Sequence, residues 1–149
     1  NKQPNSLEEV TGDVAARIYQ RINQERIMLD FAPDLPLVSF DYGLILQALT
    51  NLVDNAVRYE PEDSRVILRG VLTPKIAQLW VINHGDNITT EEKEHIMQPF
   101  YHGKSGRIGL GLPIAKGIIE AHRGRLLLQD TPPKGATFII ELPLDAKAE

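Results

Sequence analysis

The 149-residue sequence predicts an α/β (α+β) two-layer sandwich, with helices packed against a sheet. Two observations support this fold class. Three segments carry apolar residues at helical spacing, and several short apolar runs are bounded by Gly, Pro, Asn, Asp or Ser. With 42% hydrophobic and 24% charged residues, the composition suits one globular domain with a single core.

Composition excludes several classes of protein. The chain has no cysteine, so disulfides, zinc–thiolate sites and cysteine nucleophiles are ruled out. A net charge of -4 argues against a nucleic-acid partner, which normally selects a basic surface. The sequence has no apolar run long enough to span a bilayer and no signal-peptide pattern. We therefore expect a soluble domain without direct membrane contact, although the parent protein could be membrane-bound.

The first helix is predicted from residue 6 onward. Residues 1–5 read as a linker or chain edge, and residues 6–9 (Ser-Leu-Glu-Glu) fit a capping box. Apolar residues at helical spacing continue the helix to near Arg26. Residues 27–31 then read as a short strand, and residues 32–36 as a proline-broken loop.

The central helix is predicted over residues 42–59, with Asp41 as its N-cap. A turn at residues 61–64 follows it. Strand patterns occupy residues 65–71 and 76–82, joined across Thr73-Pro74. The segment 83–108 has a weak pattern and contains one short helix near residues 90–97. A connection of this length is typical of a functional or mobile segment.

A third long helix is predicted from Pro113 to about His122, because proline suits the first helical turn and Gly124 suits the C-terminal cap. His122 would close this helix, where a cation suits the helix dipole. Two closing strands are expected at residues 125–129 and 136–142. The expected domain therefore spans residues 6–143, and residues 144–149 form a tail.

A polar stripe on the central helix is the strongest functional signal. At about 100° per residue, Asn51, Asp54, Asn55 and Arg58 fall on one narrow side of the helix. The opposite side is apolar, with Leu49, Leu52, Val53, Ala56 and Val57 among its residues. Asn and Asp are mediocre helix formers, so their clustering indicates a function. Oxygen ligands beside an arginine could hold a hard cation together with a phosphate.

A second signal is the glycine pair of Gly109-Leu110-Gly111-Leu112, which leads directly into the third helix. Glycines allow a close backbone approach, and a helix N-terminus attracts phosphate. Lys104 and Arg107 lie just before this pair and would add positive charge. The simpler interpretations are an ordinary turn and solvated loop charges.

A third signal is the segment Asn83-His84-Gly85-Asp86-Asn87-Ile88, where an apolar strand passes into a polar turn. The simpler interpretation is a plain loop in which Gly85 and Asn87 adopt left-handed backbone conformations. The order of the three signals along the chain is more distinctive than any one alone.

In that order, the chain resembles the catalytic and ATP-binding domain of sensor histidine kinases, in the Bergerat-type ATPase superfamily. The resemblance covers about residues 6–143 and implies a mixed, mostly antiparallel sheet packed against three helices. Residues 51–59 resemble the N box of this family, and residues 83–88 its first glycine box. Residues 97–101 resemble the F box, 109–112 the second glycine box, and 135–138 the last box.

The resemblance implies specific roles. Asn55 would be the metal ligand for Mg²⁺, and Asp54 would orient a metal-bound water or handle a proton. Asn51 and Arg58 would contact phosphates, and Tyr59 would pack beside the nucleotide. The other residues expected to contact ATP are Asn83, Gly85, Asn87, Ile88, Lys104, Arg107, Gly109, Leu110, Gly111, Leu112 and Thr137. The segment 86–108 would form a lid over the phosphates.

Four positions depart from the family pattern. Family members usually carry aspartate at the position of Asn83, where it accepts a hydrogen bond from the adenine amino group. Asn87 and Arg107 stand where glycines are expected, and His102 replaces a frequent arginine. An amide gives up the charge-assisted bond, so we expect weak but real nucleotide binding. On the same reasoning, the substitution Asn83→Asp is expected to tighten it.

The predicted function is that of the ATP-binding catalytic domain of a two-component sensor histidine kinase. It would transfer the γ-phosphoryl group to a histidine on a separate dimerisation domain, from which a response regulator receiver domain receives it. None of His84, His95, His102 and His122 is expected to be that acceptor. The alternatives are a degenerate binding or scaffolding module of the same fold, an anti-sigma serine kinase or other Bergerat-type ATPase, and a nucleotide-free structural domain.

Overall fold

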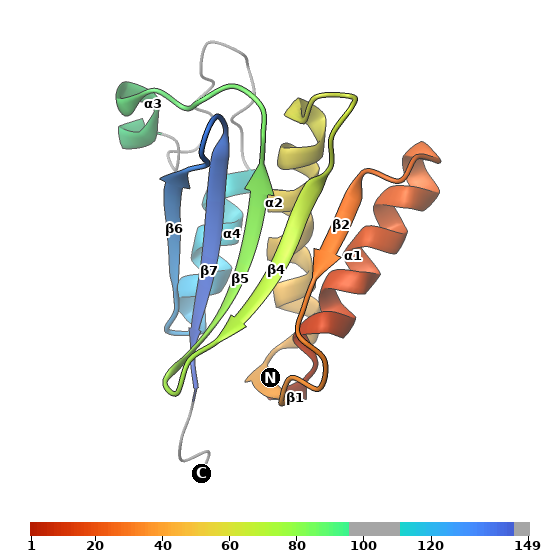
Figure 1. Ribbon diagram of the computed structural model, residues 1–149. Coiled ribbons are helices and arrows are strands. Elements are labelled where there is room, and N and C mark those ends of the chain that lie inside the picture. The colour runs from red at the N-terminus through yellow and green to blue at the C-terminus, as the bar shows by residue number, and fades with distance from the viewer. Residues whose placement is uncertain (96–110, 145–149) are drawn as a thin grey trace.

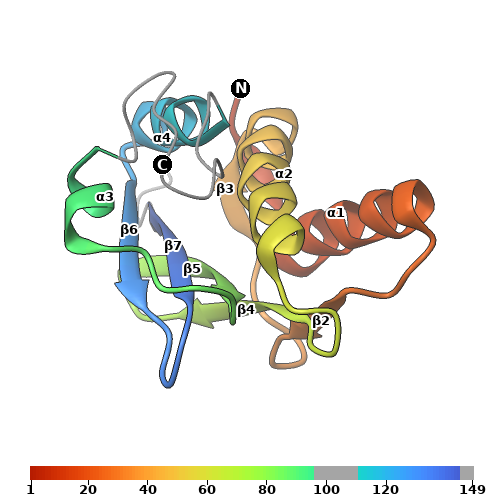
Figure 2. The same cartoon turned by 90° about the horizontal axis from the view of Figure 1, so that it is seen from above.

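The computed structural model describes residues 1–95 and 111–144, and it confirms the two-layer α/β fold. A five-stranded sheet forms one layer, in the order β2-β4-β5-β7-β6. Three long helices lie together on one face of this sheet (Figures 1 and 2). The strands of the sheet are β2 (Ile27–Asp30), β4 (Val66–Leu72), β5 (Ile76–Asn83), β6 (Arg125–Asp130) and β7 (Ala136–Pro143).

The sheet is mixed, as expected. The edge strand β2 runs parallel to β4, with Ile27 paired to Val66. The other three pairings are antiparallel, and they place Asn83 at the end of β5 opposite Ala136 at the start of β7. This register brings the polar segment after β5 beside the turn that enters β7.

The long helices are α1 (Leu7–Ile22), α2 (Tyr42–Tyr59) and α4 (Gly111–Ala121), and a short α3 covers Thr90–His95. Both predicted N-caps are confirmed: Ser6 Oγ accepts from the Glu9 N–H at 3.1 Å, and Asp41 Oδ1 accepts from the Leu44 N–H at 3.0 Å. Within the described ranges, no helix has both the length and the apolar character needed to cross a membrane.

Helix α1 ends earlier than predicted, at Ile22 rather than near Arg26. Asn23 adopts a left-handed conformation with φ of 55°, and its N–H donates to the carbonyl of Tyr19 at 2.7 Å. Asparagine tolerates this conformation better than most residues, so it terminates the helix. The prediction placed the end of the helix near Arg26 and so missed this stop.

A small second sheet was not predicted. Strand β1 (Gln3–Asn5) pairs antiparallel with β3 (Val38–Phe40), so the segment expected to be a linker contains a strand. The side-chain amide of Asn5 also donates to the carbonyl of Phe40 at 2.9 Å. Strands of three residues are too short to show a period. The only trace of this pair in the burial pattern is that Val38 and Phe40 of β3 are buried.

One continuous core fills the space between the helices and the sheet. The apolar face of α2 lies at its centre, with Ile45, Leu49, Leu52 and Val53 fully buried. Side chains from alternate positions of β4, β5 and β7 meet this face. Burial on this scale stabilises a domain by about 25 cal/mol per Å² of apolar surface. The position of α2 on the sheet is therefore fixed by its apolar side.

His122 ties α4 to α2 rather than acting as a cation at a helix end. Its ring is buried, Nδ1 donates to the carbonyl of Ile118 at 2.9 Å, and Nε2 accepts from the Asp41 N–H at 3.1 Å. A ring that donates with one nitrogen and accepts with the other is neutral imidazole. The expected favourable charge at the helix end is thus replaced by two hydrogen bonds.

The sheet face that points away from the helices carries a polar cluster around Glu141. Burial by itself raises the pKa of the Glu141 carboxyl, but hydrogen bonds from Arg125 and Gln78 outweigh that effect and hold it below its ordinary value. Arg125 Nη2 lies 2.8 Å from Oε1, and Gln78 Nε2 lies 2.7 Å from Oε2.

The substitution Glu141→Gln should lower the melting temperature at pH 7. Because the pKa of Glu141 is lower in the folded state, its stabilising effect is present above the unfolded value of about 4.3 and is lost as pH falls through the folded value. The effect should be about 1 kcal/mol or less, because Arg125 is largely exposed.

Thermal unfolding between pH 2 and 8 measures this difference, with Glu62→Gln as the control at an exposed carboxylate. The two variants should converge at the acid end. A Glu141→Gln difference that is independent of pH would show that packing, not charge, is what Glu141 contributes.

Candidate functional site

The polar stripe of α2 lies beside the apolar face that the core buries. Asn51, Asp54, Asn55 and Tyr59 are half-buried, and Arg58 is exposed. The amphipathic pattern read from the sequence is therefore present in the structure. The C-terminal end of α2, the end of β5 and the first residues of α4 all lie at the same end of the domain (Figure 1).

A pocket joins the end of α2 to the end of β5. Its lining comes from three elements and the loop after β5: Asn55, Ala56, Tyr59, Val81, Asn83, Ile88, Ala136 and Phe138. Most of these side chains are apolar or aromatic, and two amides supply polar groups. The free volume is about 10 Å³, room for a single water-sized sphere. A larger ring must push the lining apart on entry.

Asn83 is buried, and its amide is held on both sides. The amide nitrogen donates to the carbonyl of Ala56 at 2.8 Å and to Glu60 Oε1 at 3.0 Å. The amide oxygen accepts from the Gly85 N–H at 2.9 Å. Three contacts therefore fix the orientation of a residue that the sequence identified as a ligand contact.

These contacts reverse the expectation that Asn83→Asp tightens nucleotide binding. An aspartate here would place a second carboxylate against buried Glu60, at the 3.0 Å now spanned by a hydrogen bond. Two carboxylates that share a site repel each other unless one takes a proton. The contact with Glu60 therefore favours the opposite expectation, namely weaker binding, and nothing in the spacing of the two residues indicated that they are neighbours.

Gly85 is required by space rather than by conformation. A Cβ at this position would lie 2.3 Å from the carbonyl oxygen of Tyr59 and 3.1 Å from Asn83 Oδ1. Neither Gly85 nor Asn87 has a positive φ, so the left-handed conformations of the plain-loop interpretation are absent at both residues. Asn87 instead accepts a hydrogen bond from the Gly135 N–H at 2.8 Å. It thereby links the loop after β5 to the turn before β7.

Thr137 is not brought into the pocket. Its hydroxyl is buried against that of Thr131 at 2.7 Å, whereas the neighbouring Ala136 and Phe138 line the pocket. Successive residues of a strand point to opposite faces of the sheet, so only one parity can face the helices. Thr137 is therefore not among the residues that line the pocket, whereas its neighbours on the strand, Ala136 and Phe138, are.

Asp54 makes an ion pair with Arg21, which reaches it from α1. The hydrogen bond from the guanidinium to Asp54, and the charge of that carboxylate, raise the pKa of Arg21 above its ordinary value. Both side chains are partly exposed, so the pair is a weak restraint. It nonetheless occupies the carboxylate to which the sequence assigned a catalytic role.

The second glycine box is described only in part. Gly111 and Leu112 belong to α4, which therefore includes two residues before the predicted start at Pro113, and Leu112 is buried in the core. The expected contacts Lys104, Arg107, Gly109 and Leu110 lie outside the described residues, as do most of the expected lid and the F box.

A magnesium site built from several protein carboxylates is not present in the described part of the chain, which holds no group of three or more His, Asp or Glu residues suited to a metal. Asn55 supplies one side-chain oxygen at the pocket. Mg²⁺ usually keeps water molecules and takes substrate phosphates along with few protein ligands, so one amide oxygen is compatible with it.

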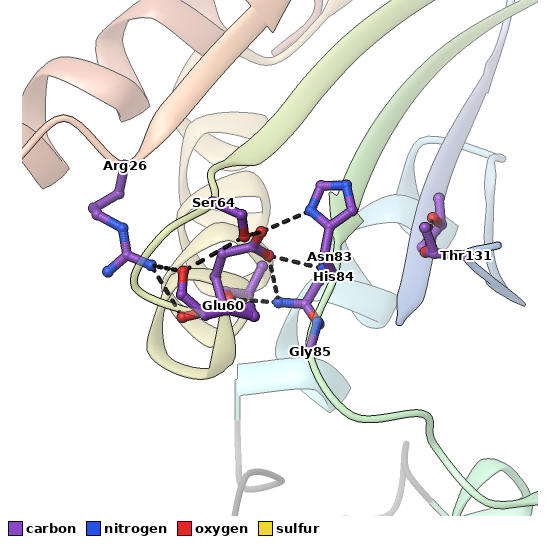
Figure 3. Close-up of polar contacts among 10 residues, drawn as sticks. Arg26, Glu60, Ser64, Asn83, His84, Gly85 and Thr131 are labelled. Atoms are coloured by element: carbon purple, nitrogen blue, oxygen red, sulfur yellow. Dashed lines mark hydrogen bonds and ion pairs between the residues drawn. The ribbon is translucent and has the colours of Figure 1, made fainter. Parts of the chain in front are cut away.

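Sequence reasoning missed the residue that organises this end of the domain, Glu60. Its side chain is fully buried (0% exposed) and accepts from four groups (Figure 3). Oε1 accepts from the Asn83 amide and from the His84 N–H at 2.8 Å. Oε2 accepts from His84 Nδ1 at 2.6 Å and from the Ser64 hydroxyl. A glutamate after a helix normally reads as exposed, so the sequence carried no signal for it.

Arg26 fixes the backbone that carries this carboxylate. Its Nη2 donates to the carbonyls of Glu60 at 3.0 Å and Pro61 at 2.9 Å (Figure 3). These contacts hold the end of α2 against the start of β2. The apolar lining residues Ala136 and Phe138 were also missed, although the alternation along β7 could have predicted them.

Three features lie at the same end of the domain: an amide-bearing helix face, an apolar slot with one oriented amide, and a helix N-terminus. Together they are typical of a nucleotide-binding α/β sandwich. Comparison with known proteins identifies the family. Residues 40–146 match the family described as "Histidine kinase-, DNA gyrase B-, and HSP90-like ATPase". The chain belongs to this family, and within it to the sensor histidine kinase type.

Individual relatives agree with this assignment. The adaptive-response sensory kinase SasA of Trichormus variabilis is 32% identical over 142 residues, which is 91% of this chain and 35% of SasA. The solved catalytic domain of histidine kinase ThkA is 29% identical, with a TM-score of 0.83 over 97% of this chain and 98% of that one. The mycobacterial sensor histidine kinase MprB is 27% identical, with a TM-score of 0.83 over the same shares. The chain thus spans about a third of the curated relative.

The substitution Gly85→Ala should destabilise the fold by about 2 kcal/mol, because the added methyl group overlaps the carbonyl of Tyr59. Gly12→Ala in α1 is the matched control, since nothing lies within 4 Å of its Cβ position. It should stabilise the protein by about 0.5 kcal/mol or more, because alanine is the better helix former. Urea unfolding measures both, and equal effects would refute the close approach at Gly85.

Proposed function

We propose that this domain binds ATP with Mg²⁺ and supplies the catalytic half of a sensor histidine kinase. The observation that carries the proposal is the shared pocket. Asn55 and Tyr59 of α2 line the same slot as Asn83 and Ile88, although the two segments are far apart in sequence. Separate motifs that resemble one ATP site therefore converge on one place in the fold.

The residues suit phosphoryl transfer, which depends mainly on positioning and charge neutralisation. The apolar slot would take the base, and the Asn51–Arg58 side of α2 would meet the phosphates. Asn55 would hold Mg²⁺, which when bound neutralises phosphate charge. The first turn of α4 would add unpaired N–H groups beside the phosphates. Asp54 would orient a water or the acceptor once it parts from Arg21.

Nucleotide binding is tested by calorimetry and by thermal shift with Mg–ATP. Binding to the folded state alone raises stability by RT ln(1 + [L]/Kd), so even weak binding shifts the midpoint at millimolar nucleotide. The substitution Asn55→Ala should weaken Mg–ATP binding by at least about tenfold, because it removes the metal ligand.

The control for that experiment is Gln20→Ala, which removes an exposed amide from α1. It should leave the affinity for Mg–ATP unchanged. Absence of heat and of thermal shift in the unsubstituted protein at millimolar Mg–ATP would contradict the proposal.

The phosphoryl acceptor would be a histidine on a dimerisation domain of the same protein, and a response regulator receiver domain would take the group from it. We further infer a cytoplasmic location, where ATP is available.

Combined with that dimerisation domain and Mg–ATP, the chain should form an acid-labile phosphohistidine. Alone it should form none. Of the two histidines whose side chains the structure describes, His122 is buried and His84 is bonded to Glu60.

A binding module without phosphotransfer is the second candidate, and one observation favours it. Arg21 pairs with Asp54, which removes the free carboxylate from the N-box face. ATP binding without any phosphohistidine in the combined reaction would support this candidate. If Arg21→Ala then restored phosphotransfer, the ion pair would be a restraint on an active kinase rather than a mark of degeneration.

A further inference from the structure

Glu60 is a buried carboxylate to which the proposed function gives no role. It lies at the C-cap of α2, on the polypeptide directly after the pocket residue Tyr59. Four donors surround its two oxygens, and they come from β5, the residue after it, and the turn before β4 (Figure 3). A buried carboxylate is costly without such partners, so its position must be specified closely.

The contacts of Asn83 show what this carboxylate does. Both acceptors on the amide nitrogen are oxygens, namely the carbonyl of Ala56 and Oε1 of Glu60. Turning the amide over would set its oxygen against these two oxygens and its nitrogen against the Gly85 N–H. The amide is therefore held in one orientation, and Glu60 provides the charge-assisted part of the restraint.

The orientation decides what Asn83 can offer to a ligand. Both amide hydrogens are engaged, while the oxygen has two lone pairs and gives one to Gly85. The remaining capacity is that of an acceptor. In a slot with mainly apolar walls, a single acceptor matches a flat heteroaromatic ring that carries an exocyclic amine. A ring with a carbonyl at that position would meet oxygen with oxygen.

We propose that Glu60 is a positioning residue for base recognition, which fixes Asn83 as an acceptor so that the pocket selects a purine with an exocyclic amine over one with a carbonyl. The inference rests on the proposed function of the site as a nucleotide pocket. It also accounts for the asparagine at position 83, because the site holds one carboxylate and that carboxylate is at residue 60.

The single-carboxylate arrangement predicts a reciprocal exchange. Asn83→Asp alone opposes two buried carboxylates and should reduce both thermal stability and affinity for ATP. Glu60→Gln alone removes the charge, so the hydrogen bond from the Asn83 amide is no longer charge-assisted and the amide is held less firmly. The carbonyl of Ala56 and the Gly85 N–H still favour the present orientation. The double substitution Glu60→Gln with Asn83→Asp restores one carboxylate and one amide, with the carboxylate now at the pocket.

The experiment measures Kd by calorimetry for Mg–ATP and for Mg–ITP, whose base carries a carbonyl in place of the amine, together with the melting temperature. Glu62→Gln, an exposed carboxylate two residues away, is the matched control and should resemble the unsubstituted protein. We expect the unsubstituted protein to favour ATP over ITP by at least about tenfold. Glu60→Gln should lower that ratio by about threefold, because only the charge-assisted part of the restraint on Asn83 is lost, whereas Asn83→Asp should weaken ATP binding by about tenfold or more.

The double variant should recover part of the stability and ATP affinity that Asn83→Asp loses, a non-additive result that only coupled residues give. Recovery is incomplete because the carbonyl of Ala56 faces the new carboxylate. An unchanged ATP-to-ITP ratio in Glu60→Gln would overturn the role of Glu60, as would a double variant no better than Asn83→Asp. If Asn83→Asp does not fold, recovery of folding in the double variant supports the coupling, and its absence contradicts it. Binding of neither nucleotide to the unsubstituted protein would instead refute the proposed function itself.

Discussion

The packing of α2 against the sheet is the constraint on which the rest of this domain depends. One side of this helix is apolar over its whole length, and that side is buried at the centre of the core. Burial fixes the rotation of the helix about its axis. The polar stripe beside the buried side therefore lies where Asn55 and Tyr59 meet the end of the central strand β5. The position of the site is thus a consequence of core packing.

A second constraint acts where α2 ends. The buried carboxylate of Glu60 is bonded to donors from Asn83, His84 and Ser64, whereas Arg26 bonds the backbone carbonyl of the same residue. A buried carboxylate is tolerated only when protein hydrogen bonds replace those it would make to water. The end of α2 and the segment after β5 must therefore move as a unit. A change in either segment is transmitted to the pocket, because Asn83 belongs to both the network and the lining.

Periodicity predicted most of the elements, and the misses have physical causes. The three long helices and the strands of the main sheet were found because long amphipathic patterns are strong signals. The β1–β3 pair was missed because three residues cannot display a period. The end of α1 was misplaced because Asn23, rather than a glycine, terminates it. Thr137 was assigned to the pocket in error, since motif position alone does not reveal which face of β7 a residue occupies.

By itself, the sequence determined the family, the two-layer fold and the side of α2 that carries the polar residues. Each of these follows from spacing along the chain, which is a local property. The tertiary structure determined which side chains from different elements contact one another. It alone brought Glu60 within 3.0 Å of Asn83 across 23 positions in the sequence, and it alone paired Arg21 with Asp54. Contacts of this kind depend on how far apart two elements are packed, and no pattern within either element contains that distance.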